Sequence, residues 1–241
     1  MKKIFGTNGI PFWNASEIAL RDTFKKTFTR EVIDMLAEEN VSWRTHVNEI
    51  EGPLMLPDIL LNPNYTEDDV WWFKDDDLVM RPETTASSYA YMHHLMDQTS
   101  IKPPMVVWQA GKSFRREQDQ VSKHMRLKEF YQQEFQCFFT ADTLNDYQSA
   151  IMPKLAQMFS HELAIPTRVV ESDRLPAYSR LTMDVEADMG DRWMEICSVS
   201  VRTDFTRPAV FTAKNKRIEK EMLVLEIAIG LDRCVYARNE K

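Results

Sequence analysis

Two stretches of the sequence combine arginines, acids and an aromatic residue in patterns that suit a bound nucleotide. The first covers residues 109–117 and resumes at 126–130. Its Arg115 can pair with a phosphate through two parallel N–H donors, which the point charge of a lysine does less selectively. Glu117 can accept a hydrogen bond from an amino group on adenine, and Phe130 offers a flat face for the base. Taken alone, the stretch is equally compatible with a charged hairpin that holds a structural ion pair.

The second stretch, residues 225–233, runs from a strand that carries Glu226 through Gly230 into a helix. Glycine has no side chain, so the backbone at Gly230 can approach a ligand closely. Arg233 falls in the first helical turn, where the helix dipole favours an anion and disfavours a cation. A bound phosphate explains an arginine at this position. The alternative is an exposed Arg233 that pairs with Asp232 or Glu226.

The strands that must hold these stretches can be read from the hydrophobic pattern. Apolar and alternating segments predict strands near residues 41–50, 105–110, 130–139, 168–170, 181–186, 193–201 and 222–228. Residues 105–139 are expected to form a long antiparallel hairpin with a charged loop between its strands. The polar, turn-rich segment 62–69 is expected to be an exposed loop.

Helices are predicted at residues 16–40, from Thr84 onward, at 142–163 and at 230–238. Ser16 is a suitable cap for the first of them. Pro153 marks a kink or the first turn of a second helix. Five apolar side chains recur every four residues along the first helix and form one face: Leu20, Phe24, Phe28, Val32 and Leu36. The predicted fold class is therefore an α+β domain in which helices flank an antiparallel sheet.

The composition predicts one large domain over residues 1–241. The net charge of −7 argues against a protein that coats nucleic acid broadly. The three cysteines stand far apart without metal-ligand spacing, so we expect buried free thiols. The sequence shows no signal peptide and no apolar stretch of membrane-spanning length. A cytoplasmic protein that makes no contact with a membrane is expected.

Both arginine-bearing stretches resemble signature motifs of the class II aminoacyl-tRNA synthetases. Residues from about 105 to 139 resemble motif 2, and residues from about 222 to 238 resemble motif 3. The predicted helix, the strand after it and Pro53, within about 16–57, are similar to motif 1, which forms the dimer interface in that family. The three motifs occur in the family's order over nearly the whole chain. The resemblance implies a homodimer whose catalytic domain activates an amino acid with ATP.

Further segments resemble the glycyl subclass of these enzymes. Residues 80–84 resemble its Arg-Pro-Glu-Thr segment, part of which histidyl enzymes share, and residues 109–117 match its version of motif 2. Three more segments and one arginine follow in the order of the subclass: 177–178, 184–186, 193–195 and Arg202. The resemblance implies that the substrate is a small amino acid, with glycine favoured.

For the nucleotide, the resemblance implies a role for several residues. Arg115 would bind the α-phosphate of ATP and stabilise the charge that develops during adenylate formation. Glu117 would bind the adenine amino group, while Phe130 would stack on the ring. Arg126 would lie near the phosphates, and Arg233 would hold the γ-phosphate of a bent triphosphate.

For the metal and the amino acid, the resemblance implies roles for acids and one serine. Glu195 and Glu226 would hold Mg²⁺ on the phosphates. Glu83 and Glu134 would accept hydrogen bonds from the ammonium group of the amino acid. Ser198 stands near the amino-acid pocket, where glycyl enzymes carry a glycine.

Departures from the family pattern leave the acceptor of the amino acid open. Family members continue past motif 3 into an anticodon-binding domain, for which this sequence has no counterpart. The loop 118–125 lacks their usual Pro, Arg and Gly, while Gln136 and Lys128 replace an acid and an arginine. The acceptor is either tRNA or another molecule, such as a carrier protein, a protein lysine or a modified nucleic-acid base. A non-catalytic binding subunit is a third alternative, which the intact ATP ligands disfavour.

Overall fold

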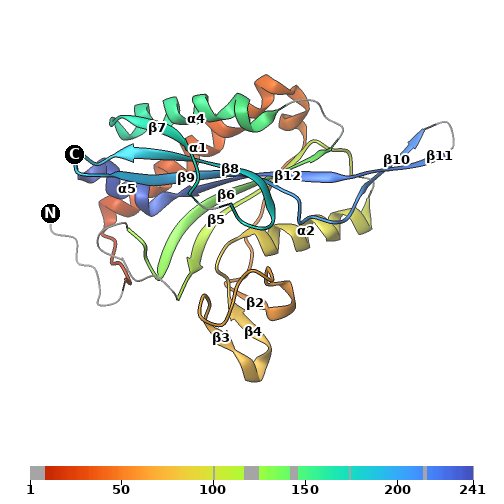
Figure 1. Ribbon diagram of the computed structural model, residues 1–241, viewed down its shortest axis with the longest axis horizontal. Coiled ribbons are helices and arrows are strands. Elements are labelled where there is room, and N and C mark those ends of the chain that lie inside the picture. Colours follow the sequence, from red (N-terminus) through yellow and green to blue (C-terminus); the bar gives the residue numbers. More distant parts are fainter. Residues whose placement is uncertain are drawn as a thin grey trace.

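The computed structural model describes residues 9–99, 101–116, 125–141, 146–173, 175–213 and 216–240. Its main feature is a seven-stranded sheet with the strand order β1-β5-β6-β12-β9-β8-β7 (Figure 1). The strands are β1 (Val47–Glu49), β5 (Met105–Phe114), β6 (Glu129–Thr140), β7 (Thr167–Glu171), β8 (Ser179–Asp188), β9 (Trp193–Arg202) and β12 (Met222–Gly230). β1 is parallel to β5, and all other neighbours are antiparallel. The predicted antiparallel sheet with flanking helices is confirmed.

Helices cover both faces of this sheet (Figure 1). The helices of the described residues are α1 (Ala15–Glu39), α2 (Thr85–Gln98), α4 (Tyr147–Leu163) and α5 (Leu231–Asn239). α1, α4 and α5 pack together on one face, and α2 lies on the other. β12 shows how the sequence separates the two faces. Leu225, Ile227 and Ile229 enter the core beneath α1 and α4, so Glu226 and Ala228 point to the opposite face.

The first helix differs from its prediction at the cap. Asn14, rather than Ser16, is the N-cap, and its side chain accepts a hydrogen bond from the backbone N–H of Glu17. The Glu17 carboxylate accepts one from the Asn14 N–H in return, which completes a capping box. Of the predicted apolar face, four residues are buried: Phe24, Phe28, Val32 and Leu36.

Other boundaries also shift. Residues 41–50 form a 3₁₀ turn, η1 (Val41–Thr45), before the short β1, so the single predicted strand there is wrong. Pro153 lies inside α4, while residues 142–145 of the predicted helix fall outside the described residues. The three cysteines are buried and free, as expected. In the described part of the chain, no helix combines the length and the apolarity that a bilayer crossing requires.

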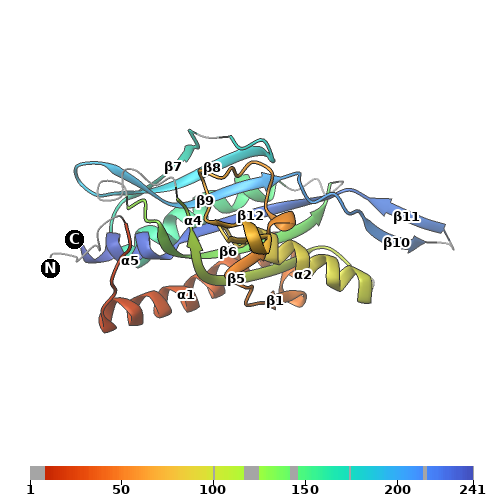
Figure 2. The ribbon, with the colours of Figure 1, turned by 90° about the horizontal axis from the view of Figure 1, so that it is seen from below.

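Two small sheets are attached to the main one. β2 (Met55–Pro57), β4 (Leu78–Met80) and β3 (Trp72–Phe73) form a module on the same side as α2, together with the turns η2 (Asp58–Leu60) and η3 (Lys74–Asp76). The hairpin β10 (Ala209–Ala213) and β11 (Lys216–Lys220) projects beyond the end of the main sheet in both views (Figures 1 and 2). The hairpin was not predicted, because both strands have only five residues and β11 consists mostly of charged residues.

Candidate active site

One cavity of about 690 Å³ opens on the face of the sheet that carries Glu226. It is lined by residues from β6, β8, β9 and β12, by the segments before β3, α2, β6 and β8, and by the end of β5 and the start of α5. All the predicted site residues that the structure describes line it: Glu83, Arg115, Arg126, Phe130, Glu134, Glu195, Ser198, Glu226, Gly230 and Arg233. Glu117 lies outside the described residues. Residues that are up to 150 positions apart in the sequence are thus brought to a single site.

Arg115 lies where β5 ends, beside the segment that precedes α2. Its Nε donates a hydrogen bond to the carbonyl oxygen of Pro82 over 3.2 Å. Its guanidinium carbon lies 5.4 Å from the centre of the Phe130 ring on β6. The charge of Arg115 acts on Glu83 and on Glu195. Arg115 therefore stands between two acids at different parts of the cavity.

Arg233 occupies the first turn of α5. Its Nη1 donates to the carbonyl oxygen and to the carboxylate Oε1 of Glu195, both over 2.9 Å. The charge of Arg233 is the main cause that holds the pKa of Glu195 below its ordinary value. Asp232, an alternative partner in the sequence, instead accepts a hydrogen bond from the backbone N–H of Tyr131. A Cβ at Gly230 would lie 3.3 Å from the Cδ of Arg233, so the glycine leaves room for the arginine stem.

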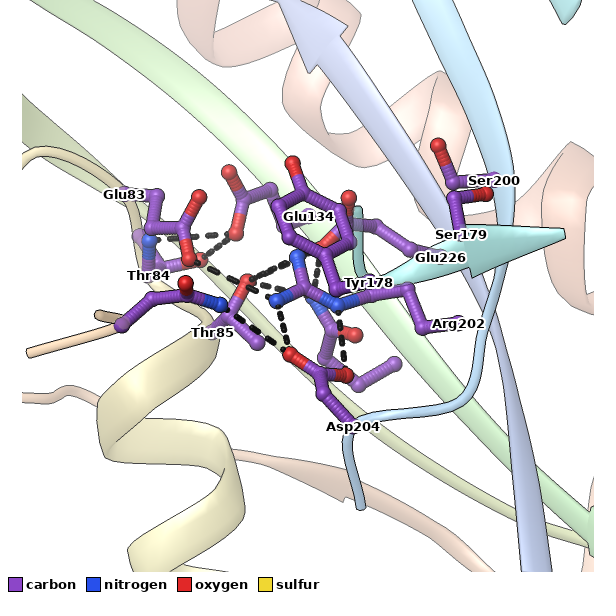
Figure 3. A network of polar contacts seen from close by, with 12 residues as sticks. Glu83, Thr84, Thr85, Glu134, Tyr178, Ser179, Ser200, Arg202, Asp204 and Glu226 are labelled. Atoms are coloured by element: carbon purple, nitrogen blue, oxygen red, sulfur yellow. Dashed lines mark hydrogen bonds and ion pairs between the residues drawn. The ribbon is translucent and has the colours of Figure 1, made fainter. Parts of the chain in front are cut away.

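Three buried glutamates gather at the other end of the cavity (Figure 3). Glu83, Glu134 and Glu226 are 6%, 3% and 7% exposed and come from the segment before α2, from β6 and from β12. On the paired strands, Glu134 lies opposite Ala228, two residues from Glu226, so both acids share one face. Such a concentration of buried negative charge requires a cationic partner.

Arg202 is that partner within the chain. It is 1% exposed and donates through Nη1 to Glu226 over 2.8 Å and through Nη2 to Asp204 over 2.7 Å. Its Nη2 also lies 3.7 Å from a carboxylate oxygen of Glu83. The ring of Tyr178 covers the guanidinium at 3.9 Å (Figure 3). One arginine therefore balances several acids, and the site keeps a surplus of negative charge.

Glu134 has the most perturbed carboxyl group of this cluster. Burial, reinforced by the charges of Glu226 and Glu83, raises its pKa to about 8. Its Oε2 accepts hydrogen bonds from the backbone N–H and the hydroxyl of Thr84 at the start of α2. A carboxyl group in this setting is ionised readily once a cation binds beside it.

Arg81 connects the segments that carry the site. Its Nε donates to the carbonyl oxygen of Lys112 over 2.7 Å, and its Nη1 donates to that of Gly52 over 2.9 Å. A Cβ at Gly111 would lie 2.3 Å from its Nη2, so any other residue there would displace the guanidinium. The buried guanidinium thereby ties the strand end at Arg115 to the segment that holds Glu83.

Comparison with known proteins identifies the family. Residues 71–241 match the family model described as the tRNA synthetase class II core domain (G, H, P, S and T). The chain belongs to this family. The glycine–tRNA ligase of Mycoplasmopsis synoviae (strain 53) is 27% identical over 173 residues, which cover 66% of this chain and 38% of the relative. That of Alkaliphilus metalliredigens (strain QYMF) is 31% identical over 133 residues, which cover 54% of this chain and 29% of the relative.

Solved structures show the same fold. A prolyl-tRNA synthetase from Cryptosporidium parvum, complexed with halofuginone and AMPPNP, matches with a TM-score of 0.73 at 13% identity, over 99% of this chain and 49% of that one. A seryl-tRNA synthetase from Pyrococcus horikoshii, complexed with ATP, matches with a TM-score of 0.67 at 19% identity, over 95% and 52%. This class II core thus spans about two fifths or less of the curated relatives described and about half of the solved chains.

The resemblance implied that Glu195 and Glu226 hold Mg²⁺, but the structure does not bring these two acids close enough to share one ion. The strand register places Glu226 opposite Ser200, five residues along β9 from Glu195. At about 3.3 Å per residue, the Cα atoms of the two acids lie roughly 15 Å apart. Ligand atoms of one Mg²⁺ lie about 2.1 Å from the ion. Glu226 also accepts hydrogen bonds from three side chains: Thr85, Gln136 and Arg202.

Glu195 itself remains suitable for a metal that arrives with a triphosphate. Its side chain is 46% exposed. On the neighbouring strand β8, Asp184 lies within range of its charge and has a buried Oδ1 that finds no hydrogen-bond partner among the described residues. Within the described ranges no group of three or more histidines, cysteines or acids could hold a metal alone. Mg²⁺ commonly uses one or two carboxylates plus phosphates, so these residues fit the ion as part of a nucleotide complex.

Some cavity residues could not be found from the sequence. Tyr65 lies in the loop predicted to be exposed, yet it lines the cavity and donates a hydrogen bond to Glu83. Tyr178 and Asp184 were identified as family segments without a role. The Asn-Pro-Asn-Tyr sequence around Tyr65 signals a turn and nothing about what its side chain meets.

Proposed function

We propose that this class II core activates a small amino acid with ATP, forming an aminoacyl-adenylate and pyrophosphate, and transfers the amino acid to tRNA. The observation that carries the proposal is one cavity with two chemically different ends. Arg126 and Arg233 supply positive charge at one end, three buried glutamates lie at the other, and Arg115 stands between them. A nucleoside triphosphate and an α-ammonium group are the complementary ligands.

At the phosphate end, the arginines would hold the triphosphate along the cavity. Arg233 would bind the γ-phosphate where the N-terminus of α5 also favours an anion. Arg115 would bind the α-phosphate, and Phe130 beside it would stack on the adenine ring. The ion pair between Arg233 and Glu195 keeps the arginine pointed into the cavity until ATP competes for it.

At the glutamate end, the ammonium group of the amino acid would add positive charge to that of Arg202. Glu83 and Glu134 would accept its hydrogen bonds. Glu226, which lies beside them and away from Glu195, would be a third acceptor. Ser198 and Ala228 lie between Glu134 and Asp184 in one row across the sheet. Their short side chains leave room above the sheet for a small amino acid. Because the relatives include glycine–tRNA ligases, glycine is the first candidate for this amino acid.

The reaction would need no protein nucleophile. A carboxylate oxygen of the amino acid would attack the α-phosphorus, and the bond to the bridging oxygen would break so that pyrophosphate leaves with the electron pair. Arg115, placed between the two ends, would stabilise the charge at the α-phosphate, while the glutamates orient the attacking group. Bound Mg²⁺ beside Glu195 would neutralise part of the phosphate charge. Catalysis by this chain would consist of positioning and charge stabilisation.

The test is amino-acid-dependent exchange of labelled pyrophosphate into ATP, run with each standard amino acid. We expect a strong response to one small amino acid, with glycine the first choice. Silence with all of them would contradict adenylate formation. Charging of total tRNA comes next, and exchange without charging would redirect the proposal to a non-tRNA acceptor. The homodimer inferred from motif 1 stays a prediction.

The raised pKa of Glu134 predicts a pH dependence of amino-acid binding. Below about 8 this carboxyl group carries a proton in the free protein, and a bound ammonium group would require its release. The KM for the amino acid should therefore fall as the pH rises from about 6 to 8, by up to about tenfold per unit, and then level off. Exchange kinetics across this range measure the effect, with the KM for ATP as the internal comparison.

Glu134→Gln cannot ionise and is the matched variant. Its KM for the amino acid should be higher than that of the wild type and nearly independent of pH in this range. A wild-type KM that stays constant from pH 6 to 8 would contradict the role of Glu134.

A further inference from the structure

Tyr65 reaches the centre of the cavity from outside the main sheet. It lies in the loop between η2 and β3, and its hydroxyl donates a hydrogen bond to the Glu83 Oε2 over 2.9 Å. The charges of Arg115 and Glu83 both act on its hydroxyl group, and the hydroxyl of Tyr178 is close enough to interact with it electrostatically. Tyr65 is therefore placed where the phosphate end of the cavity meets the glutamate end.

The loop that carries Tyr65 is held in place at both ends. Asn62 donates through Nδ2 to Asp204 over 3.1 Å, and Asp204 is itself a partner of Arg202. At the other end, the backbone N–H of Arg116 donates to the carbonyl oxygen of Asp69 over 2.8 Å. Asn62 and Tyr65 of this loop thus donate hydrogen bonds to two acids that contact Arg202, namely Asp204 and Glu83. A tyrosine on such a fixed loop can hold its partner in one orientation.

The hydrogen bond has a chemical consequence for Glu83. Burial is the main cause that raises the pKa of this carboxyl group, and the donated hydrogen bond from Tyr65 acts against that shift. Donation to Oε2 favours the carboxylate form and turns the other oxygen toward Arg202, 3.7 Å from its Nη2. Without the hydroxyl, Glu83 would be less ionised and less restrained.

We propose that Tyr65 is a positioning residue for the amino acid, acting through Glu83. The inference rests on the proposed function, because it assumes that Glu83 accepts from the substrate ammonium group. Tyr65 orients the carboxylate that receives the ammonium and leaves the triphosphate contacts unchanged. Binding of the amino acid then depends on the module around β2, β4 and β3 as well as on the sheet.

Tyr65→Phe tests the inference, since it removes the hydroxyl and keeps the ring. We expect the KM for the amino acid in pyrophosphate exchange to rise about tenfold, as for a lost hydrogen bond to a charged group. The kcat and the KM for ATP should change less than about twofold. Tyr91→Phe, on α2 and outside the cavity, is the matched control and should behave as the wild type. Thermal unfolding of both variants checks that the fold is retained.

A double-mutant cycle separates action through Glu83 from a direct contact. In a Glu83→Gln background, adding Tyr65→Phe should change the KM for the amino acid by less than about twofold. Equal effects of Tyr65→Phe in both backgrounds would overturn the inference. So would an active wild type whose amino-acid KM is unaffected by Tyr65→Phe, and the proposed function would then stand. A wild type that is silent with every amino acid refutes the proposed function and the inference with it.

Discussion

Arg115→Ala is expected to abolish ATP–pyrophosphate exchange. Arg115 is the arginine that lies between the two ends of the cavity, beside Pro82 and Phe130. Removing one preorganised electrostatic donor from a site of developing charge costs about 3–4 kcal/mol, or roughly 10²- to 10³-fold in rate. The loss should appear in kcat, because the charge on the α-phosphate grows toward the transition state. Initial rates of exchange at saturating ATP and amino acid provide the measurement.

Two further variants make this result specific. Arg115→Lys keeps the charge but loses the fork of parallel donors, so it should retain part of the activity. Arg44→Ala removes an exposed arginine that pairs with Asp34 on α1 and does not line the cavity, and it should exchange at the wild-type rate. An Arg115→Ala protein with near-normal exchange would refute the assignment of the α-phosphate site.

Arg202→Met should have the largest effect on stability. The substitution keeps an apolar stem of similar length but leaves three acids without their shared cation: Glu83, Asp204 and Glu226. Breaking a buried ion pair from one side costs about 3–5 kcal/mol. For a domain of this size, each kcal/mol lowers the Tm by roughly 2–4 °C. We therefore expect a drop in Tm of roughly 6–20 °C, measured by thermal unfolding at neutral pH.

The comparison variant is Arg168→Met on β7. Arg168 also pairs with a carboxylate, that of Glu186, and covers the ring of Trp193, but its side chain is 46% exposed. Exposed pairs contribute about 0–1 kcal/mol, so its Tm should change little. Adding Glu226→Gln to Arg202→Met should recover part of the lost stability, because it removes one of the uncompensated charges. Equal Tm values for Arg202→Met and Arg168→Met would contradict the role given to the buried network.

The arginine-bearing end of the cavity could be predicted well from the sequence. Arg115 directly follows the first strand of one hairpin and Phe130 stands on its second strand, while Gly230 and Arg233 stand at one strand-to-helix turn. In both cases the residues that must meet are close along the chain, so local structure alone decides their arrangement. The same locality explains why the hairpin and the helix after Gly230 were predicted with small errors in their ends.

The glutamate-bearing end could be predicted only in part, since it is assembled from distant segments. The family resemblance implied that Glu226 would hold Mg²⁺. The register of β12 against β9 and β6 instead places it near Glu134 and Arg202. A pairing register depends on the whole sheet, and the alternation within one strand does not reveal which residue of another strand lies opposite.

By itself, the sequence determined the antiparallel sheet with its helices, the family motifs and the arginines that line the cavity. Hydrophobic periodicity and short-range spacing carry that information. Only the tertiary structure decided that Glu226 joins the other glutamates around Arg202 and that Tyr65 turns from its polar loop into the cavity. Both outcomes depend on contacts between segments far apart in the chain, where burial and charge balance act on the assembled molecule as a whole.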